Sequence, residues 1–418
     1  VQRFPAPLAE SVEARQKLAD WAGENGDGMG RRRWLDGIVA ADRDAGGART
    51  DRSRYLAALA KLELTAAERD AFRSIALVAP LKQTLASKKV AMERAIAGYQ
   101  EASGYAVTEV TTAATYEMGE LYRTLAADLM KSERPANLDA EELEQYDLLL
   151  EEQAFPFEEK SVEVHEINAR RAADGLYDES VRKSYAVLAE VEPARFGKKV
   201  EPESFVANLV PPAPAAGPAG AGDPASARLS SGGASEPESP APAGTSLPAP
   251  AIEPATQQAF DDAVAKLEAG DFAGARPILE QLVVSQPTLA APAVNLGILH
   301  ARENRWLEAE ASLQEGIRRD AASAVAFNEL AAVQREAGRF ADAEASYRQA
   351  LAADPAHYRT HRNIAVLLDL YLWRPAEALQ HFESYLSMSG TADRQVSGWI
   401  AELKRRVGDV AQTAGVQP

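Results

Sequence analysis

The chain has 418 residues, 46% of them hydrophobic and 26% charged, which is the composition of an ordinary globular protein with two or three domains. Its formal net charge of −17 argues against nucleic acid and against anionic membrane surfaces as partners, because both require a basic footprint. The absence of cysteine excludes disulfides, thiolate metal sites and a cysteine nucleophile.

The amino-terminal end begins with VQRFPAP at Val1, which is not a natural start, so we expect an upstream segment to be missing. No stretch approaches the ~20 consecutive apolar residues that a transmembrane helix needs. We therefore predict no direct membrane insertion.

Residues 1–205 are predicted to form a helical domain without strands, built of helical hairpins. A long helix is expected over residues 105–131, and Asp139 with Glu142 is typical of a helix start. Pro156 interrupts the next helical pattern. Because proline is well tolerated in the first turn of a helix, we interpret it as the start of a second helix and the corner of a hairpin.

An acidic run covers residues 139–167, which hold eleven acids and one lysine. A solvated helix face explains it best, and a docking surface for a basic partner is the alternative. A rival hypothesis is a metal-dependent or acid–base enzyme that uses residues 151–166, but His165 fits no zinc signature. His357 and His361 have the spacing of metal ligands, yet no third ligand lies near them in sequence. We predict no catalytic residue, no metal site and no cofactor.

A linker is predicted over residues 206–254. Its centre, residues 211–251, consists mostly of Pro, Ala, Gly and Ser. Such a composition cannot bury enough apolar surface to offset chain entropy, so we expect this segment to be disordered and to join two domains.

A repeat follows the linker. The segments GDFAGA, NRWLEA and GRFADA begin at Gly270, Asn304 and Gly338, a constant spacing of about 34 residues. A fourth copy follows with one residue inserted, so that Ala378 aligns with Ala343. Small residues recur where two helices of a hairpin would touch, at Ala263 with Ala275, Gly297 with Ala309, Ala331 with Ala343, and Ala365 with Ala378.

This helix–turn–helix period resembles the tetratricopeptide repeat, and the hairpins of residues 1–205 resemble a degenerate form of it. The resemblance implies an all-α fold with a tetratricopeptide superhelix, an α-solenoid of about four repeats, over residues 255–408. The amphipathic segment 393–407 is expected to cap its open end, and residues 409–418 are expected to be a disordered tail.

The resemblance also implies a concave groove, lined by the first helix of each hairpin, that binds proteins or peptides. Transferring the family's inward positions gives a candidate peptide-binding groove of Val294, Ile298, Arg302, Asn328, Ala332, Arg335, Arg362, Val366 and Asp369. Its three arginines could hold an acidic segment, because guanidinium groups bind carboxylates bidentately. The lysine–asparagine carboxylate clamp of some family members is absent as a set, so capture of a chain terminus is not expected.

The phrases ATYEMGELYR (114–123), ELEQYDLLLEEQAFPFEEKSVEVHEINARR (142–171) and NIAVLLDLYLWRPAEALQHFESYL (363–386) together resemble bacterial tetratricopeptide proteins of the cell envelope. Some of these are encoded beside ExbB/TolQ-type motors and TonB- or gliding-type systems. The resemblance implies a non-enzymatic scaffold in the bacterial envelope, in the periplasm. A cytoplasmic co-chaperone is the alternative, and the sequence leaves the partner and the oligomeric state open.

Overall fold

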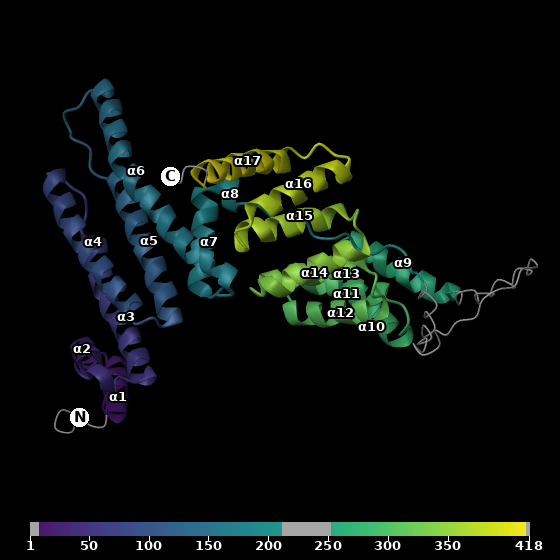
Figure 1. Cartoon of the computed structure of the whole chain (residues 1–418), viewed down its shortest axis with the longest axis horizontal. Coiled ribbons are helices and arrows are strands. Elements are labelled where there is room, and N and C mark those ends of the chain that lie inside the picture. The colour runs from purple at the N-terminus through teal and green to yellow at the C-terminus, as the bar shows by residue number, and fades with distance from the viewer. Residues whose placement is uncertain (1–7, 211–251, 415–418) are drawn as a thin grey trace, which may run out of the picture. The chain divides into compact units, whose positions relative to one another are not determined.

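The computed structural model describes residues 8–210 and 252–414, so the centre of the predicted linker, residues 211–251, and the end of the predicted tail lie outside the described residues. Every regular element in the described residues is helical, as the sequence predicted (Figure 1). The chain divides into two compact units. The first comprises residues up to Lys199 together with Ala365–Leu386 and the segment from Gly390, and the second comprises Val200–Ile364 with Ser387–Ser389.

The first unit is built of consecutive helices that pack in hairpins, α1 with α2, α3 with α4, and α5 with α6. In Figure 1, α3, α4, α5 and α6 lie side by side. The bounds of its helices are α1 Leu8–Glu24, α2 Gly28–Asp44, α3 Asp51–Ser74, α4 Leu81–Ser103, α5 Thr108–Met130, α6 Ala140–Arg170, α7 Glu179–Val191, α8 Pro193–Phe196, α16 Pro375–Ser389 and α17 Arg394–Ala414. The end of α16, Ser387–Ser389, is assigned to the second unit.

The predicted start of α6 is confirmed, because Asp139 accepts from the amide of Glu142 at 2.9 Å while the Glu142 side chain accepts from the amide of Asp139 at 3.0 Å. This reciprocal pair satisfies two backbone donors that a helix start leaves without intrahelical partners.

The predicted helix break at Pro156 is wrong, since α6 continues through it without interruption. One stripe of side chains, spaced by four and three positions, runs through the proline and faces the core, at Leu150, Ala154, Phe157, Ser161, Val164 and Asn168. Ser161 donates to the carbonyl of Gly119 on α5 at 3.1 Å, and Asn168 donates to the carbonyl of Thr112 at 3.2 Å. Before the proline, the buried Ala154 packs in one hydrophobic cluster with Leu121 and Leu125 of α5. Contacts with α5 on both sides of Pro156 therefore hold the helix together, while the proline itself is exposed.

The second unit contains the predicted repeat hairpins. Figure 1 shows α9 to α14 in green, and each hairpin packs against the next. Phe272, Trp306 and Phe340 each begin the second helix of a hairpin, at the constant spacing of the sequence repeat. The helices are α9 Pro254–Glu268, α10 Phe272–Ser285, α11 Ala291–Arg302, α12 Trp306–Arg319, α13 Ala324–Glu336 and α14 Phe340–Ala353.

The small residues of these hairpins are fully buried, as the repeat register requires. At Gly297 an added Cβ would lie 2.6 Å from Leu313, so only glycine permits this approach of α11 to α12. The C-terminal part of the chain therefore has the tetratricopeptide-repeat fold, and the all-α prediction is confirmed.

The fourth sequence repeat begins with α15, Tyr358–Val366, and contains the inserted residue that the sequence indicated. A π-helical stretch, Leu367–Tyr371, continues α15. A π-turn accommodates one residue more than an α-turn, which matches the single inserted residue of this repeat. Beyond it, α17 buries the four apolar residues predicted for the capping helix, Val396, Trp399, Ile400 and Leu403.

We expect Ala343→Trp to destabilise the second unit. Ala343 is fully buried on α14, and overpacking of a well-packed core costs roughly 1–3 kcal/mol or more. The measurement is a thermal melt followed by circular dichroism. Ala345→Trp is the matched control, because Ala345 is exposed on the same helix. Equal melting of the two variants would contradict the repeat register.

Candidate peptide-binding groove

The first helices of the repeats in the second unit already hold a polypeptide segment, and that segment belongs to the same chain. Val200–Val210, called the internal segment below, has no helix or strand of its own. It meets α15 at Glu201, α13 at Glu203 and α11 at Val206. Leu209 then joins the hydrophobic cluster of α9 and α10. The internal segment thus runs from the fourth repeat towards the first.

Three side chains at equivalent positions of successive repeats accept from its backbone amides. Asn363 accepts from the amide of Glu201 at 2.7 Å, Glu329 from that of Glu203 at 2.7 Å, and Asn295 from that of Val206 at 2.7 Å. Both asparagines also donate to the carbonyl of the same residue, at 2.9 Å. We call these three residues the backbone ladder. Because its partners are peptide groups, it recognises an extended chain and carries little sequence information.

Acidic side chains of the internal segment meet a polar set on α13 and α15. The Glu201 carboxylate lies 3.1 Å from Nε of Arg359 and 3.3 Å from Nη1 of Arg362. The buried Glu203 carboxylate accepts from Asn328 at 2.7 Å, with Arg359 at 3.6 Å. The charge-assisted pairs of Glu201 with Arg359 and Arg362 explain why an acidic segment is accepted here.

Apolar contacts hold the other half of the internal segment. The guanidinium carbon of Arg302 lies 4.0 Å from the centre of the Phe205 ring, and the same ring packs edge-on against Phe272. Arg302 also donates to the carbonyl of Glu203 at 3.0 Å. Phe205 and Val206 pack on the hydrophobic cluster that contains Val294 and Ile298. The guanidinium of Arg302 therefore binds Phe205 through its flat face and the Glu203 carbonyl through its edge. Burial lowers the pKa of Arg302.

Two buried carboxyl groups face each other across this contact. Burial, with the charge of Glu329 as the second cause, raises the pKa of Glu203 to about 8. Burial likewise raises the pKa of Glu329. His357 lies 3.4 Å from Glu203, and burial lowers the pKa of that imidazole. The contact is consequently sensitive to protonation near neutral pH.

The residues predicted from the family's inward positions fall into three groups. Arg302, Asn328 and Arg362 contact the internal segment directly, and Val294 and Ile298 form the apolar floor under it. Arg335 pairs with Glu336, and Ala332 is half-buried. Val366 and Asp369 belong to the first unit, where the buried Asp369 carboxylate accepts from Lys198 at 2.6 Å and from Arg406 at 2.5 Å. Their role in peptide binding stays a prediction.

Sequence reasoning missed the backbone ladder, together with Arg359 and His357. The available signal was the identical amide at Asn295 and Asn363, two repeat lengths apart, with Glu329 midway between them. The prediction chose positions 294, 328 and 362, which are one residue earlier in each repeat. It also placed Val206–Val210 in the linker, whereas these residues are described and begin with a ladder contact.

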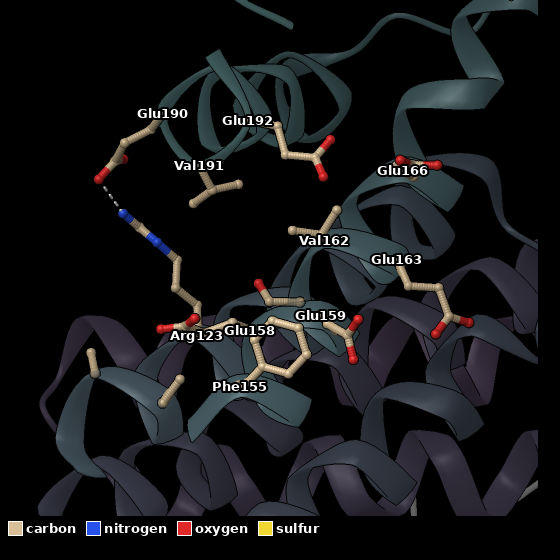
Figure 2. Close-up of a pocket in the computed structure, with 13 residues that line it drawn as sticks. Arg123, Phe155, Glu158, Glu159, Val162, Glu163, Glu166, Glu190, Val191 and Glu192 are labelled. Carbon is tan, nitrogen blue, oxygen red and sulfur yellow. Dashed lines mark hydrogen bonds and ion pairs between the residues drawn. The ribbon is translucent and has the colours of Figure 1, made fainter. Parts of the chain in front are cut away.

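A second candidate site is the acidic hollow of about 800 Å³ between α5, α6 and α7 in the first unit. Figure 2 shows Arg123 joined to Glu190, at 2.7 Å, and the labelled carboxylates of Glu159, Glu163 and Glu192 spread around the hollow. In the described residues, no cluster of three or more potential ligands has the geometry to hold a metal ion. This arrangement does not favour the metal-dependent or acid–base enzyme that the acidic run suggested.

Within the part of the chain that the structure describes, none of the helices combines the length and apolar character needed to cross a bilayer.

No family model and no curated protein matches the sequence. Solved structures give partial similarities. A crystal structure of the MamA protein is 18% identical, covers 39% of this chain and 96% of its own, with a TM-score of 0.31. The Arabidopsis OM64 TPR domain is 19% identical, and the match covers 28% of this chain and 94% of that domain, with a TM-score of 0.26. The first TPR of Spaghetti (RPAP3), bound to the HSP90 peptide SRMEEVD, is 16% identical. The match covers 28% of this chain and 93% of that one, with a TM-score of 0.27.

Similarities of this size carry no argument about what this chain binds. The fold rests on the chain's own geometry, which consists of helical hairpins at a constant spacing with small residues buried at their contacts. The chain is an all-α protein with a tetratricopeptide-repeat array whose groove holds an extended segment.

Proposed function

We propose that this chain is a non-enzymatic adaptor whose repeat groove binds extended polypeptide segments. One observation carries the proposal: Asn295, Glu329 and Asn363 bind the peptide groups of an extended chain at intervals of one repeat. Hydrogen bonds to the backbone suit any extended ligand, while the arginines and the apolar floor select acidic and apolar side chains.

The cellular setting is part of the same proposal and rests on the resemblance of the sequence to envelope tetratricopeptide proteins. The adaptor would hold components of an envelope assembly or energy-transduction system, in the periplasm of a bacterium. Fractionation of the source cell with an antibody to this chain tests that setting. Recovery with the cytoplasmic fraction would instead favour the cytoplasmic alternative.

The binding proposal is tested with the full chain in which residues 200–210 are replaced by a Gly/Ser sequence of equal length. This variant exposes the backbone ladder. We expect it to bind the synthetic peptide VEPESFVANLV, which is the sequence of residues 200–210, saturably and with one site per chain. Isothermal titration calorimetry measures the affinity, and circular dichroism checks that the helices remain.

Two comparisons control this experiment. The same variant with Asn295→Ala and Asn363→Ala should lose the peptide, because four hydrogen bonds to it disappear. A peptide with lysine at both glutamate positions should not bind, since it would meet Arg359 and Arg362. A folded Gly/Ser variant that binds no peptide would overturn the proposed function.

A further inference from the structure

We propose that the internal segment is a competitor built into the chain, which a partner must displace, and that the partner's segment carries the same pattern of acidic and apolar residues. The inference rests on the proposed function, since it concerns the same groove. It adds the side-chain chemistry of the partner's segment, the direction in which that segment runs along the groove, and what regulates access to the groove.

The pattern follows from which side chains of the internal segment the groove buries. Glu201, Glu203, Phe205, Val206 and Leu209 are buried or half-buried. The remaining positions between them, Pro202, Ser204, Ala207 and Asn208, are exposed. A partner therefore needs Glu-x-Glu-x-Phe-Val-x-x-Leu or close equivalents in extended form, with its glutamates at α15 and α13 and its last apolar residue at α9 and α10.

Charge also fixes the direction. The cationic groups Arg359 and Arg362 lie at the α15 end of the groove, and the apolar cluster around Leu209 lies at the α9 end. A segment bound in the opposite direction would place its glutamates over the apolar cluster, and burying an unpaired carboxylate there is unfavourable. The groove thus selects an acidic-first, apolar-last segment that runs from the fourth repeat to the first.

Displacement leaves every helix of the repeats intact, because the internal segment belongs to none of them. Release therefore breaks only the contacts with the groove, and an incoming segment of the same pattern replaces them.

Covalent attachment makes the internal segment a strong competitor. A tethered ligand acts at an effective concentration on the order of millimolar. A free peptide of equal intrinsic affinity must overcome this advantage, so the unaltered chain should bind it at least ~10-fold more weakly than a chain whose internal segment is disabled.

The experiment compares three full-length chains for binding of a fluorescent VEPESFVANLV peptide by anisotropy. They are the unaltered chain, the Val206→Pro variant and the Gly/Ser variant described above. Proline at 206 removes the amide that donates to Asn295 and leaves the groove itself unchanged. Ala207→Pro is the matched control, because Ala207 is exposed and its amide makes none of the ladder contacts.

We expect the peptide to bind the Gly/Ser variant most tightly, then Val206→Pro, and to bind the unaltered chain and Ala207→Pro at least ~10-fold more weakly than the Gly/Ser variant. Equal affinity for the unaltered chain and the Gly/Ser variant would overturn the competitor while leaving the proposed function in place. Failure of the folded Gly/Ser variant to bind any peptide would instead overturn the proposed function.

Light scattering tests the partner's identity. The Gly/Ser variant, whose groove is free, is mixed with the Asn295→Ala, Asn363→Ala variant, whose internal segment is released but unaltered in sequence. If the mixture forms dimers that the peptide dissociates, the occupant is a second copy of this chain, and the assignment to a different partner is overturned. A monomer that binds the peptide supports it.

Discussion

Replacing Asn295 and Asn363 together with alanine should release the internal segment from the groove of the otherwise unaltered chain. Each asparagine makes two hydrogen bonds to the backbone N–H and C=O of one residue, and both asparagines are buried. At about 0.5–1.5 kcal/mol per bond, four bonds correspond to roughly 2–6 kcal/mol. The amides of Glu201 and Val206 should therefore exchange with deuterium at least ~30-fold faster, as measured by hydrogen exchange with mass spectrometry.

Asn208→Ala is the matched control for this double variant, because Asn208 is an exposed asparagine of the internal segment. It should leave exchange at both amides unchanged. Exchange within α12 and α14, which contain none of the ladder residues, reports whether the repeats stay folded. Unchanged protection of Glu201 and Val206 in the double variant would mean that the asparagines do not hold the internal segment.

Binding of the VEPESFVANLV peptide to the Gly/Ser variant should weaken as the pH rises from 5.5 to 8.5. The Glu203 side chain has a pKa of about 8 in the groove, because burial and the charge of Glu329 raise it, and the ordinary value is 4.5. We expect the equivalent glutamate of the peptide to have the raised pKa when bound and the ordinary one when free. The bound state therefore takes up a proton. This contribution to binding is complete below the ordinary pKa and is lost as the pH rises through the bound pKa.

The expected loss is about tenfold in affinity for each pH unit between those two values, since one proton is linked to binding. Other charged groups around Glu203 also act on its pKa. Arg359 lowers this pKa and Glu201 raises it, and His357 lies 3.4 Å from the carboxyl group. Calorimetry in buffers of different ionisation enthalpy measures the proton uptake directly.

A peptide with glutamine in place of Glu203 is the matched control, because it keeps the side-chain oxygen that accepts from Asn328 and removes the titrating proton. Its affinity should be nearly flat over the range in which the parent peptide's affinity falls. A parent peptide that binds equally at pH 5.5 and 8.5 would show that Glu203 binds without taking up a proton.

The sequence by itself determined the helical repeat. The constant spacing of Phe272, Trp306 and Phe340 can be read directly because each hairpin packs mainly against its neighbours, so that local pattern and tertiary contact coincide. Small residues such as Gly297 and Ala343 could be assigned to helix contacts for the same reason. The insertion in the fourth repeat was also visible, and only its accommodation by a π-helical stretch was not.

The tertiary structure decided features that depend on residues far apart in the chain. Pro156 stands inside α6 because packing on α5 outweighs the local cost of a proline, and no local pattern reveals that balance. The Asp369 carboxylate forms ion pairs with Lys198 and Arg406. The occupant of the groove could not be predicted, because Val206 and Asn295 are distant in sequence and meet through backbone atoms of the internal segment. Backbone hydrogen bonds leave little trace in side-chain identity, so only the folded chain shows which segment the repeats hold.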